Sequence, residues 1–245
     1  SSQAMFAREK SMPYPSAFPT TQATWLLTLV RACVADESSA KSAAIAQVFV
    51  MDLYAGPLAV FVRGSSLARL GEPAEIVNGF FASRLSDAEF LRAWDRSGMR
   101  LRRWLMNGIL FYGQGLARDG ARANGRSAML PAAEWSRLEG EAPTAELDFE
   151  RAWAIAVVRE ATARAENELH AEGRTVDFEI FRRHAIDGQP YAAFARELGR
   201  SEQQCAGATR LVAQRVRVRV AELLREEGVP EAEIDDEIAR VRAAL

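Results

Sequence analysis

Apolar residues recur at intervals of three and four along most of this 245-residue chain, and this spacing constrains the fold more than any other feature. Such a spacing puts apolar side chains on one face of an α-helix, whereas a half-buried strand would alternate apolar and polar residues. The segments concerned are rich in Ala, Leu, Arg and Glu, which are good helix formers. The sequence therefore predicts an all-α fold.

In the first half of the chain, helices are expected around Trp25, over residues 45–61, over residues 73–84 and from residue 100 to about residue 116. Pro57 is expected to kink or restart the second of these, because proline removes a backbone hydrogen bond inside a helix. The third begins with a proline at the first helical position, where the missing N–H does no harm. We expect glycines from residue 120 onward to end the fourth.

Residues 125–149 contain glycines and prolines among acidic residues without clear periodicity, which is typical of a linker. We therefore predict two helical domains joined by a flexible linker. The expected boundaries are an N-terminal tail over 1–17, domains over 18–124 and 150–228, the acidic linker over 125–149, and an acidic C-terminal helix over 229–245.

The second domain contains a helix-turn-helix candidate. A short helix over residues 190–198 ends at a glycine, and after a turn a long helix runs from about Cys205 to Arg225. The second helix of such a unit presents its first turns to base edges, and the candidates for these contacts are Arg210, Gln214 and Arg215. An ordinary helical hairpin with a charged outer face is the alternative. Residues 216–220 alternate valine and arginine as a strand would, but helix formers flank them and we predict a helix.

The net charge of −2 conceals blocks of opposite sign. Residues 99–126 hold six arginines against one aspartate, and residues 200–219 hold five arginines against one glutamate. Residues 134–150 and 222–245 are each net −5. Two separated basic segments suit two contacts on one polyanion such as DNA, and two solvated helix faces are the alternative.

Several classes of protein are disfavoured. The two cysteines, Cys33 and Cys205, lie far apart, and the two histidines have no partner at metal-ligand spacing, so we expect no disulfide framework, metal, cofactor or enzymatic activity. No apolar stretch approaches the roughly 20 residues that span a bilayer. The first 19 residues lack the apolar core of a signal peptide, and we expect a cytoplasmic protein without membrane contact.

The order of certain motifs carries a family resemblance. The segments concerned are Phe18-Pro19-Thr20-Thr21-Gln22 followed by Trp25, Pro57-Leu58 with Phe61, Glu75-Ile76-Val77-Asn78-Gly79-Phe80-Phe81, and Arg102-Arg103-Trp104-Leu105 with Phe111-Tyr112 and Arg118. Together they resemble region 2 of bacterial RNA polymerase sigma factors of the extracytoplasmic-function type. Residues 190–225 resemble region 4 of the same family, so the resemblance covers about 18–225.

The resemblance implies that the protein binds core RNA polymerase and directs it to promoter DNA. In region 2, aromatic and arginine side chains would hold the melted minus-ten strand, since base stacking on an aromatic ring contributes about 1–3 kcal/mol per base. The residues assigned to this role are Arg100, Arg102, Trp104, Asn107, Tyr112 and Arg118. For each aromatic residue, core packing is the alternative.

The family's acidic polymerase-binding motif corresponds to Glu72-Pro73-Ala74-Glu75, and core binding is assigned to Glu72, Glu75 and Asn78. This stretch has two acidic residues where similar members usually have three. Some relatives with a weakened motif are activated by a Ser/Thr kinase, and Ser65 or Ser66 is the corresponding candidate, because a phosphate would add about −1.5 to −2 of charge. An ordinary loop serine is the alternative.

Control by a kinase, by an anti-sigma factor or by the acidic tail are three alternatives that the resemblance leaves open. Near the region 4 candidate, Ser201 and Gln204 match a capping box, so the long helix has an earlier possible start than the family alignment gives. The alternative function is a one-component helix-turn-helix regulator that binds DNA without being a polymerase subunit.

Overall fold

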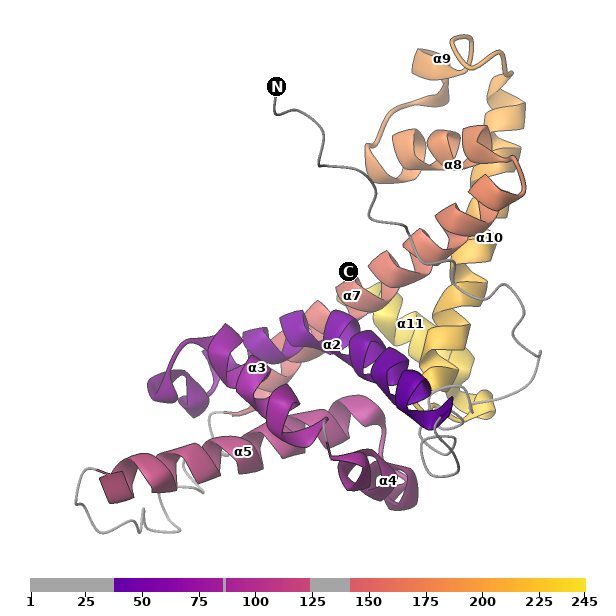
Figure 1. Ribbon diagram of the computed structural model, residues 1–245. Coiled ribbons are helices and arrows are strands. Elements are labelled where there is room, and N and C mark those ends of the chain that lie inside the picture. Colours follow the sequence, from indigo (N-terminus) through magenta and orange to yellow (C-terminus); the bar gives the residue numbers. More distant parts are fainter. Residues whose placement is uncertain (1–37, 86, 124–141) are drawn as a thin grey trace, which may run out of the picture.

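The structure is a computed structural model that describes residues 38–85, 87–123 and 142–245, and these residues form helices with no strand among them (Figure 1). The α-helices are α2 (Ser38–Gly64), α3 (Pro73–Arg84), α4 (Ala88–Ser97), α5 (Leu101–Ala123), α7 (Ala142–Ala171), α8 (Thr175–Phe181), α9 (Tyr191–Phe194), α10 (Glu202–Glu226) and α11 (Ile234–Ala244). Three short non-α turns are η1 (Ser66–Leu70), η2 (Arg182–Ile186) and η3 (Glu231–Glu233). The all-α prediction is confirmed for these residues, and the helix expected around Trp25 lies outside them.

Helix α2 packs against α7 from the start of α7 to Arg164, which lies beside the Phe49 ring. The two backbones approach closely at Gly64, where an added Cβ would lie 3.2 Å from the Cβ of Ala145. Pro57 does not restart the helix, because α2 is one helix with this proline inside it, and the expectation of a restart was wrong. Tyr54 and Leu58, on either side of the proline, are both fully buried, and their packing compensates for the lost backbone hydrogen bond.

Helix α3 begins and ends where the sequence predicts, with Pro73 in its first turn and its apolar residues Ile76, Val77, Phe80 and Phe81 buried. Helix α5 continues beyond residue 116 and through Gly120 to Ala123, so it is longer than predicted. Both helices belong to one hydrophobic core together with α2, α4 and the first two-thirds of α7, as far as Ala161.

The boundary that we predicted between the domains, at residues 149 and 150, falls inside α7. This helix starts at Ala142, and Ala145 and Phe149 in its first turns are fully buried against the N-terminal half of the chain. The same core also takes in the end of α10 and the tail, through Leu224, Ile234 and Val241. Residues 125–141 of the predicted linker lie outside the described residues, and residues 142–149 are helical rather than irregular.

Helix α7 runs away from this core to the far end of the molecule, where it meets α8 and packs beside α10 (Figure 1). Helix α9 packs on α10 at this end. Two small apolar clusters hold this end together, one around Ile180, Phe194 and Cys205 and one around Leu169 and Val212. Helix α10 then returns from the far end to the main core. As a result, the helix-turn-helix candidate and the acidic tail lie at opposite ends of α10.

Helix α10 starts at Glu202, and its cap is the capping box that the sequence offered as the earlier start. The Ser201 hydroxyl accepts from the Gln204 N–H at 3.2 Å, and the Gln204 side chain accepts from the Ser201 N–H at 2.8 Å. Residues 216–220 are helical, as predicted, and residues 234–244 of the tail form the predicted acidic helix, α11. Among the described helices, none has both the length and the apolar content needed to cross a membrane.

Candidate nucleic-acid interface

One face of α5 carries polar, aromatic and basic side chains without an acidic residue. Asn107, Phe111, Gln114 and Arg118 recur at helical spacing of three and four, and therefore lie along one line on the helix surface. Arg103 and Arg122 continue the line at its two ends. We call these six residues the α5 face. Phe111 is 64% exposed, Arg103, Arg118 and Arg122 are exposed, and the two amides are partly exposed.

The arginines of the α5 face form only local or exposed contacts with the side chains and backbone that the structure describes. Arg118 donates to the carbonyl of Gln114 at 3.1 Å, within its own helix. Arg122 lies 3.4 Å from Asp119 one turn away, and Arg103 reaches Glu146 of α7 at 2.8 Å, with both partners substantially exposed. Exposed pairs of this kind contribute at most about 1 kcal/mol. A phosphate could therefore replace these partners at small cost.

Phe111 was not among the site residues that we assigned from the sequence. Trp104 and Tyr112 were assigned instead, and the structure gives both of these rings core partners. The Trp104 ring centroid lies 5.5 Å from that of Phe90, and the Tyr112 centroid lies 6.1 Å from that of Phe80. The signal that points to Phe111 is its spacing from Asn107 and Arg118, which only becomes decisive once the buried side of α5 is known.

Arg100 and Arg102, unlike the arginines in the second half of α5, form ion pairs with carboxylates from distant parts of the chain. Arg102 is buried, and its guanidinium contacts Glu227 at 2.7 Å, Glu237 at 2.6 Å and Glu150 at 3.1 Å, while stacking 4.2 Å from the centre of the Trp153 ring. Arg100 contacts Glu233 at 2.7 Å and Glu237 at 3.0 Å. We call Arg102 and its three carboxylate partners the buried ion cluster.

Glu227 also caps the start of α5 from the end of α10. Its backbone carbonyl accepts from the Leu101 N–H at 3.2 Å, and its carboxylate accepts from the Arg102 N–H at 3.2 Å. A carboxylate in this place satisfies orphan N–H groups and interacts favourably with the helix dipole. Burial, with a further contribution from the nearby Glu150 carboxylate, nevertheless raises the pKa of Glu227 to about 7, against the opposing effect of Arg102.

The region 4 candidates lie along the first two-thirds of α10. Arg210 and Gln214 are exposed, and Arg210 is the one α10 arginine that forms no ion pair with a residue that the structure describes. Arg215 forms two hydrogen bonds with Glu172, the residue after α7, at 2.7 and 3.0 Å, and these bonds lower the pKa of the Glu172 carboxyl. Since α10 starts at Glu202, the exposed Gln203 lies nearer the start of this helix than any residue we assigned.

The candidates for polymerase binding, Glu72, Glu75 and Asn78, are all exposed at the start of α3. Neither carboxylate forms an ion pair with another described residue, and Glu75 lies in the first turn, where the helix dipole favours negative charge. Next to this helix, Gly79 leaves room for the Tyr112 hydroxyl, since an added Cβ would collide with it. The α3 and α5 surfaces are thus held against each other.

The two candidate phosphorylation sites have different environments. The Ser65 hydroxyl donates to the Val62 carbonyl at 3.1 Å and accepts from the Leu67 N–H at 3.3 Å, so it caps η1. Ser66 is partly exposed in the first position of η1 and makes no side-chain hydrogen bond to a described residue. A phosphate on Ser65 would break the cap, whereas one on Ser66 would not.

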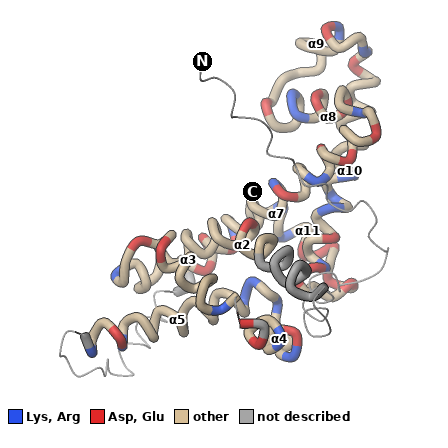
Figure 2. Tube along the Cα trace, in the orientation of Figure 1, with Lys and Arg blue, Asp and Glu red and all other residues tan. Residues whose placement is uncertain are grey.

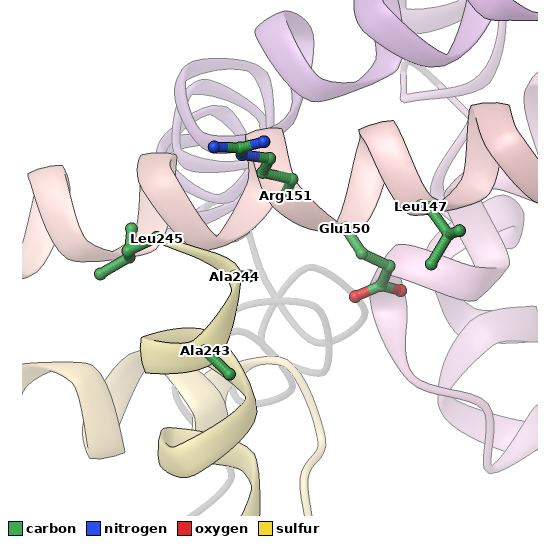
Figure 3. A pocket seen from close by; sticks show the side chains of 6 residues that line it. All are labelled: Leu147, Glu150, Arg151, Ala243, Ala244 and Leu245. Atoms are coloured by element: carbon green, nitrogen blue, oxygen red, sulfur yellow. The ribbon is translucent and has the colours of Figure 1, made fainter.

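Charged residues of both signs occur along α7 and α10, whereas α5 carries charge only towards its two ends (Figure 2). No group of three or more side chains suited to a metal ion occurs among the described residues. The C-terminal residues Ala243, Ala244 and Leu245 line a shallow pocket with Leu147, Glu150 and Arg151 of α7, so that one carboxylate of the buried ion cluster borders this pocket (Figure 3). Comparisons with protein-family models, with curated proteins and with solved structures found no match for this chain.

Proposed function

We propose that this protein is a sigma factor of the extracytoplasmic-function type, which binds core RNA polymerase and directs promoter recognition. The observation that carries the proposal is the α5 face, in which an exposed phenylalanine stands between arginines and amides with no acid among them. It lies in the segment that resembles the family's minus-ten-binding region. We expect the protein to act in the cytoplasm, to need no cofactor and to catalyse no reaction itself.

The chemistry of the α5 face suits an unpaired strand better than a duplex. An exposed ring offers a stacking surface to any base, and an unstacked base has both of its faces available. Arg103, Arg118 and Arg122 can neutralise the phosphates on either side. Asn107 and Gln114 have donors and acceptors for base edges. A protein that opens a promoter must hold such a strand, and Phe111 is the residue we propose to stack on it.

The far end of the molecule suits duplex DNA. A short helix, a turn with Gly199 at a φ of 64° and a long capped helix form a unit in which the start of α10 is exposed. Such a helix can enter a major groove, where Gln and Arg side chains bind adenine and guanine. We therefore propose that Gln203 joins Arg210 and Gln214 as candidates for base contact, with Arg215 in a supporting role because Glu172 holds it.

We propose the exposed start of α3, with Glu72, Glu75 and Asn78, as the contact with core polymerase. Since this surface has few acids, phosphorylation of Ser66 would supply additional negative charge just before it in the chain. Ser66 is preferred to Ser65 because its side chain caps nothing. We expect Ser66→Asp to bind core polymerase more tightly than the wild-type protein, and Ser65→Asp to destabilise η1 instead.

The experiment that tests the proposed function is transcription by purified bacterial core polymerase from a library of candidate promoters, with and without this protein. Initiation that depends on the protein is the expected result, and Ser66→Asp is assayed alongside. As a matched pair, Phe111→Ala should lower initiation, whereas Leu116→Ala, which truncates another exposed apolar side chain of α5, should not. Failure to co-elute with core, together with tight binding to a palindromic duplex, would instead support the one-component regulator.

A further inference from the structure

The first turns of the acidic tail place carboxylates at alternate positions, and each pairs with an arginine. Glu233 and Glu237 contact Arg100 and Arg102 at the start of α5. Glu231 and Asp235 turn the other way, towards α10. The two oxygens of Glu231 accept from Arg225 at 2.6 Å each, and Asp235 accepts from Arg217 at 2.8 Å.

The Glu231 and Asp235 carboxylates border a groove between α10 and α11. From α10, this groove is lined by Gln214, Arg217, Val218, Ala221 and Arg225, and from the tail by Glu231, Ile234, Asp235 and Ile238. Gln214, Arg217 and Arg225 continue the line that starts at Arg210, because they follow it at helical spacing. The groove is thus an extension of the exposed surface of α10, closed at one side by carboxylates.

The length of α10 determines what its second half would meet on DNA. The helix has 25 residues and is therefore about 37 Å long. A major groove is only about 12 Å wide, so the first turns of such a helix can lie inside it while the later turns pass over the phosphate backbone. Arginines on those later turns, such as Arg217 and Arg225, then face phosphates rather than bases.

The Glu231 and Asp235 carboxylates are held by exposed ion pairs, although the tail that carries them is anchored in the core. In the Asp235–Arg217 pair, the side chains are 84% and 55% exposed, and Glu231 is 73% exposed. By contrast, Ile234 and Val241 of the tail are buried in the main core. The apolar side of the tail thus holds it in place, and its outer carboxylates can leave the arginines without the tail unfolding.

We propose that the groove between α10 and α11 is a binding site for the phosphate backbone of DNA, and that Glu231 and Asp235 occupy its arginines in the free protein as an intramolecular competitor. This inference rests on the proposed contact of α10 with DNA and adds a mode of control to it. When DNA binds, phosphates replace the two carboxylates on Arg217 and Arg225. Because the two carboxylates compete with phosphates and not with bases, the tail lowers the affinity for every DNA sequence by the same factor. Binding to weak nonspecific sites is then lost before binding to strong sites.

The test measures binding of the full-length protein to a labelled random-sequence DNA duplex by fluorescence anisotropy, over about 50–200 mM salt. Asp235→Asn together with Glu231→Gln should bind about three- to tenfold more tightly than wild type, with a salt dependence steeper by up to about two phosphate contacts. Adding Arg217→Gln to this variant should remove much of the gain.

The matched control is Asp236→Asn, which removes the same charge from the neighbouring position. Asp236 is exposed and pairs with no described residue, so it should change affinity much less than Asp235→Asn alone. If Asp236→Asn and Asp235→Asn raised the affinity for DNA equally, net charge alone would explain the effect, and the proposal of an intramolecular competitor would be wrong. Promoter-dependent transcription, assayed on the same proteins, separates this failure from failure of the proposed function, since it does not depend on whether the tail competes.

Discussion

Helices α5 and α10 both carry a row of arginines, but the exposed arginine that forms no ion pair with another described residue lies towards a different end in each helix. In α5 the arginine at the start is buried among carboxylates and those further along are exposed. In α10 the exposed Arg210 lies towards the start, while Arg217, Arg219 and Arg225 are all paired. The two paired ends meet at Glu227, which ends α10 and caps α5.

This difference separates arginines that stabilise the fold from arginines that can bind a nucleic acid, and the sequence alone does not distinguish the two. Arg100 and Arg102 at the junction hold the molecule together, because their carboxylate partners come from distant parts of the chain. Arginines whose partners are exposed or local, such as Arg118 of α5 and Arg225 of α10, can exchange those partners for a polyanion. The number of arginines in a segment therefore says little about nucleic-acid binding until their carboxylate partners are known.

The largest effect is expected from removing the charge at the junction. Arg102→Met leaves the Glu227 and Glu237 carboxylates buried without their main partner, and losing one member of a buried ion pair destabilises by about 3–5 kcal/mol. Arg118→Met, in the exposed part of the same helix, should change stability by less than about 0.5 kcal/mol. Urea unfolding followed by circular dichroism measures both. If both variants lost the same free energy of unfolding, the distinction between a structural Arg102 and an exposed Arg118 would be wrong.

A pH dependence should follow from Glu227. Since the fold raises its pKa from 4.5 to about 7, the native state binds more protons than the unfolded state between these values. Stability is therefore greatest near the lower value and falls as pH rises, by about 3 kcal/mol at most. Carboxylates with lowered pKa values, such as Glu179 and Glu231, are ionised in both states above about pH 5 and do not offset this fall.

Glu227→Gln keeps the shape of the side chain and removes its ionisation. In this variant, the free energy of unfolding should decline much less between about pH 5 and pH 8 than in wild type. The remaining decline would come from Glu150 and Glu226, because burial also raises the pKa of each of these carboxyls. Arg102 retains Glu150 and Glu237 as partners, so the variant should still fold. A decline of the same size in both proteins would place the titrating group elsewhere.

At the exposed part of α5, binding rather than stability should change. Phe111→Ala is expected to weaken binding of a single-stranded oligonucleotide by about 1–3 kcal/mol, which is the contribution of one stacked base. Its unfolding free energy should stay within about 0.5 kcal/mol of wild type, because the ring is 64% exposed. Leu116→Ala serves as the control in the same titration. An equal effect of the two truncations would remove Phe111 from the interface.

The smallest effect is expected at the start of α10. Ser201→Ala removes the hydroxyl that accepts from the Gln204 N–H, and loss of such a cap destabilises by about 1 kcal/mol. Gln203→Ala, two residues further on, leaves the cap intact and should be nearly neutral for stability while reducing duplex binding. Thermal unfolding and duplex titration of both variants would show whether stability and binding are separate at this end of α10.

Much of the fold was predictable from the sequence, because local signals determined it. Helix α3 follows from its N-terminal proline and apolar spacing, and α10 starts at the capping box because both partners of that box are local. Pro57 misled us, since tertiary packing on both sides of it overrides the local preference for a break. The site was less predictable, because the partners of Arg102 lie 48, 125 and 135 residues away in the chain.

The salt dependence of single-stranded DNA binding tests the central claim most directly, namely that the exposed α5 face binds nucleic acid. Each phosphate contact that is lost should reduce the slope of log K against log salt by about 0.7 for a single strand. Arg118→Gln together with Arg122→Gln should therefore lower the slope by about 1.4 while leaving the unfolding curve unchanged. An unchanged slope in a folded double variant would contradict the account.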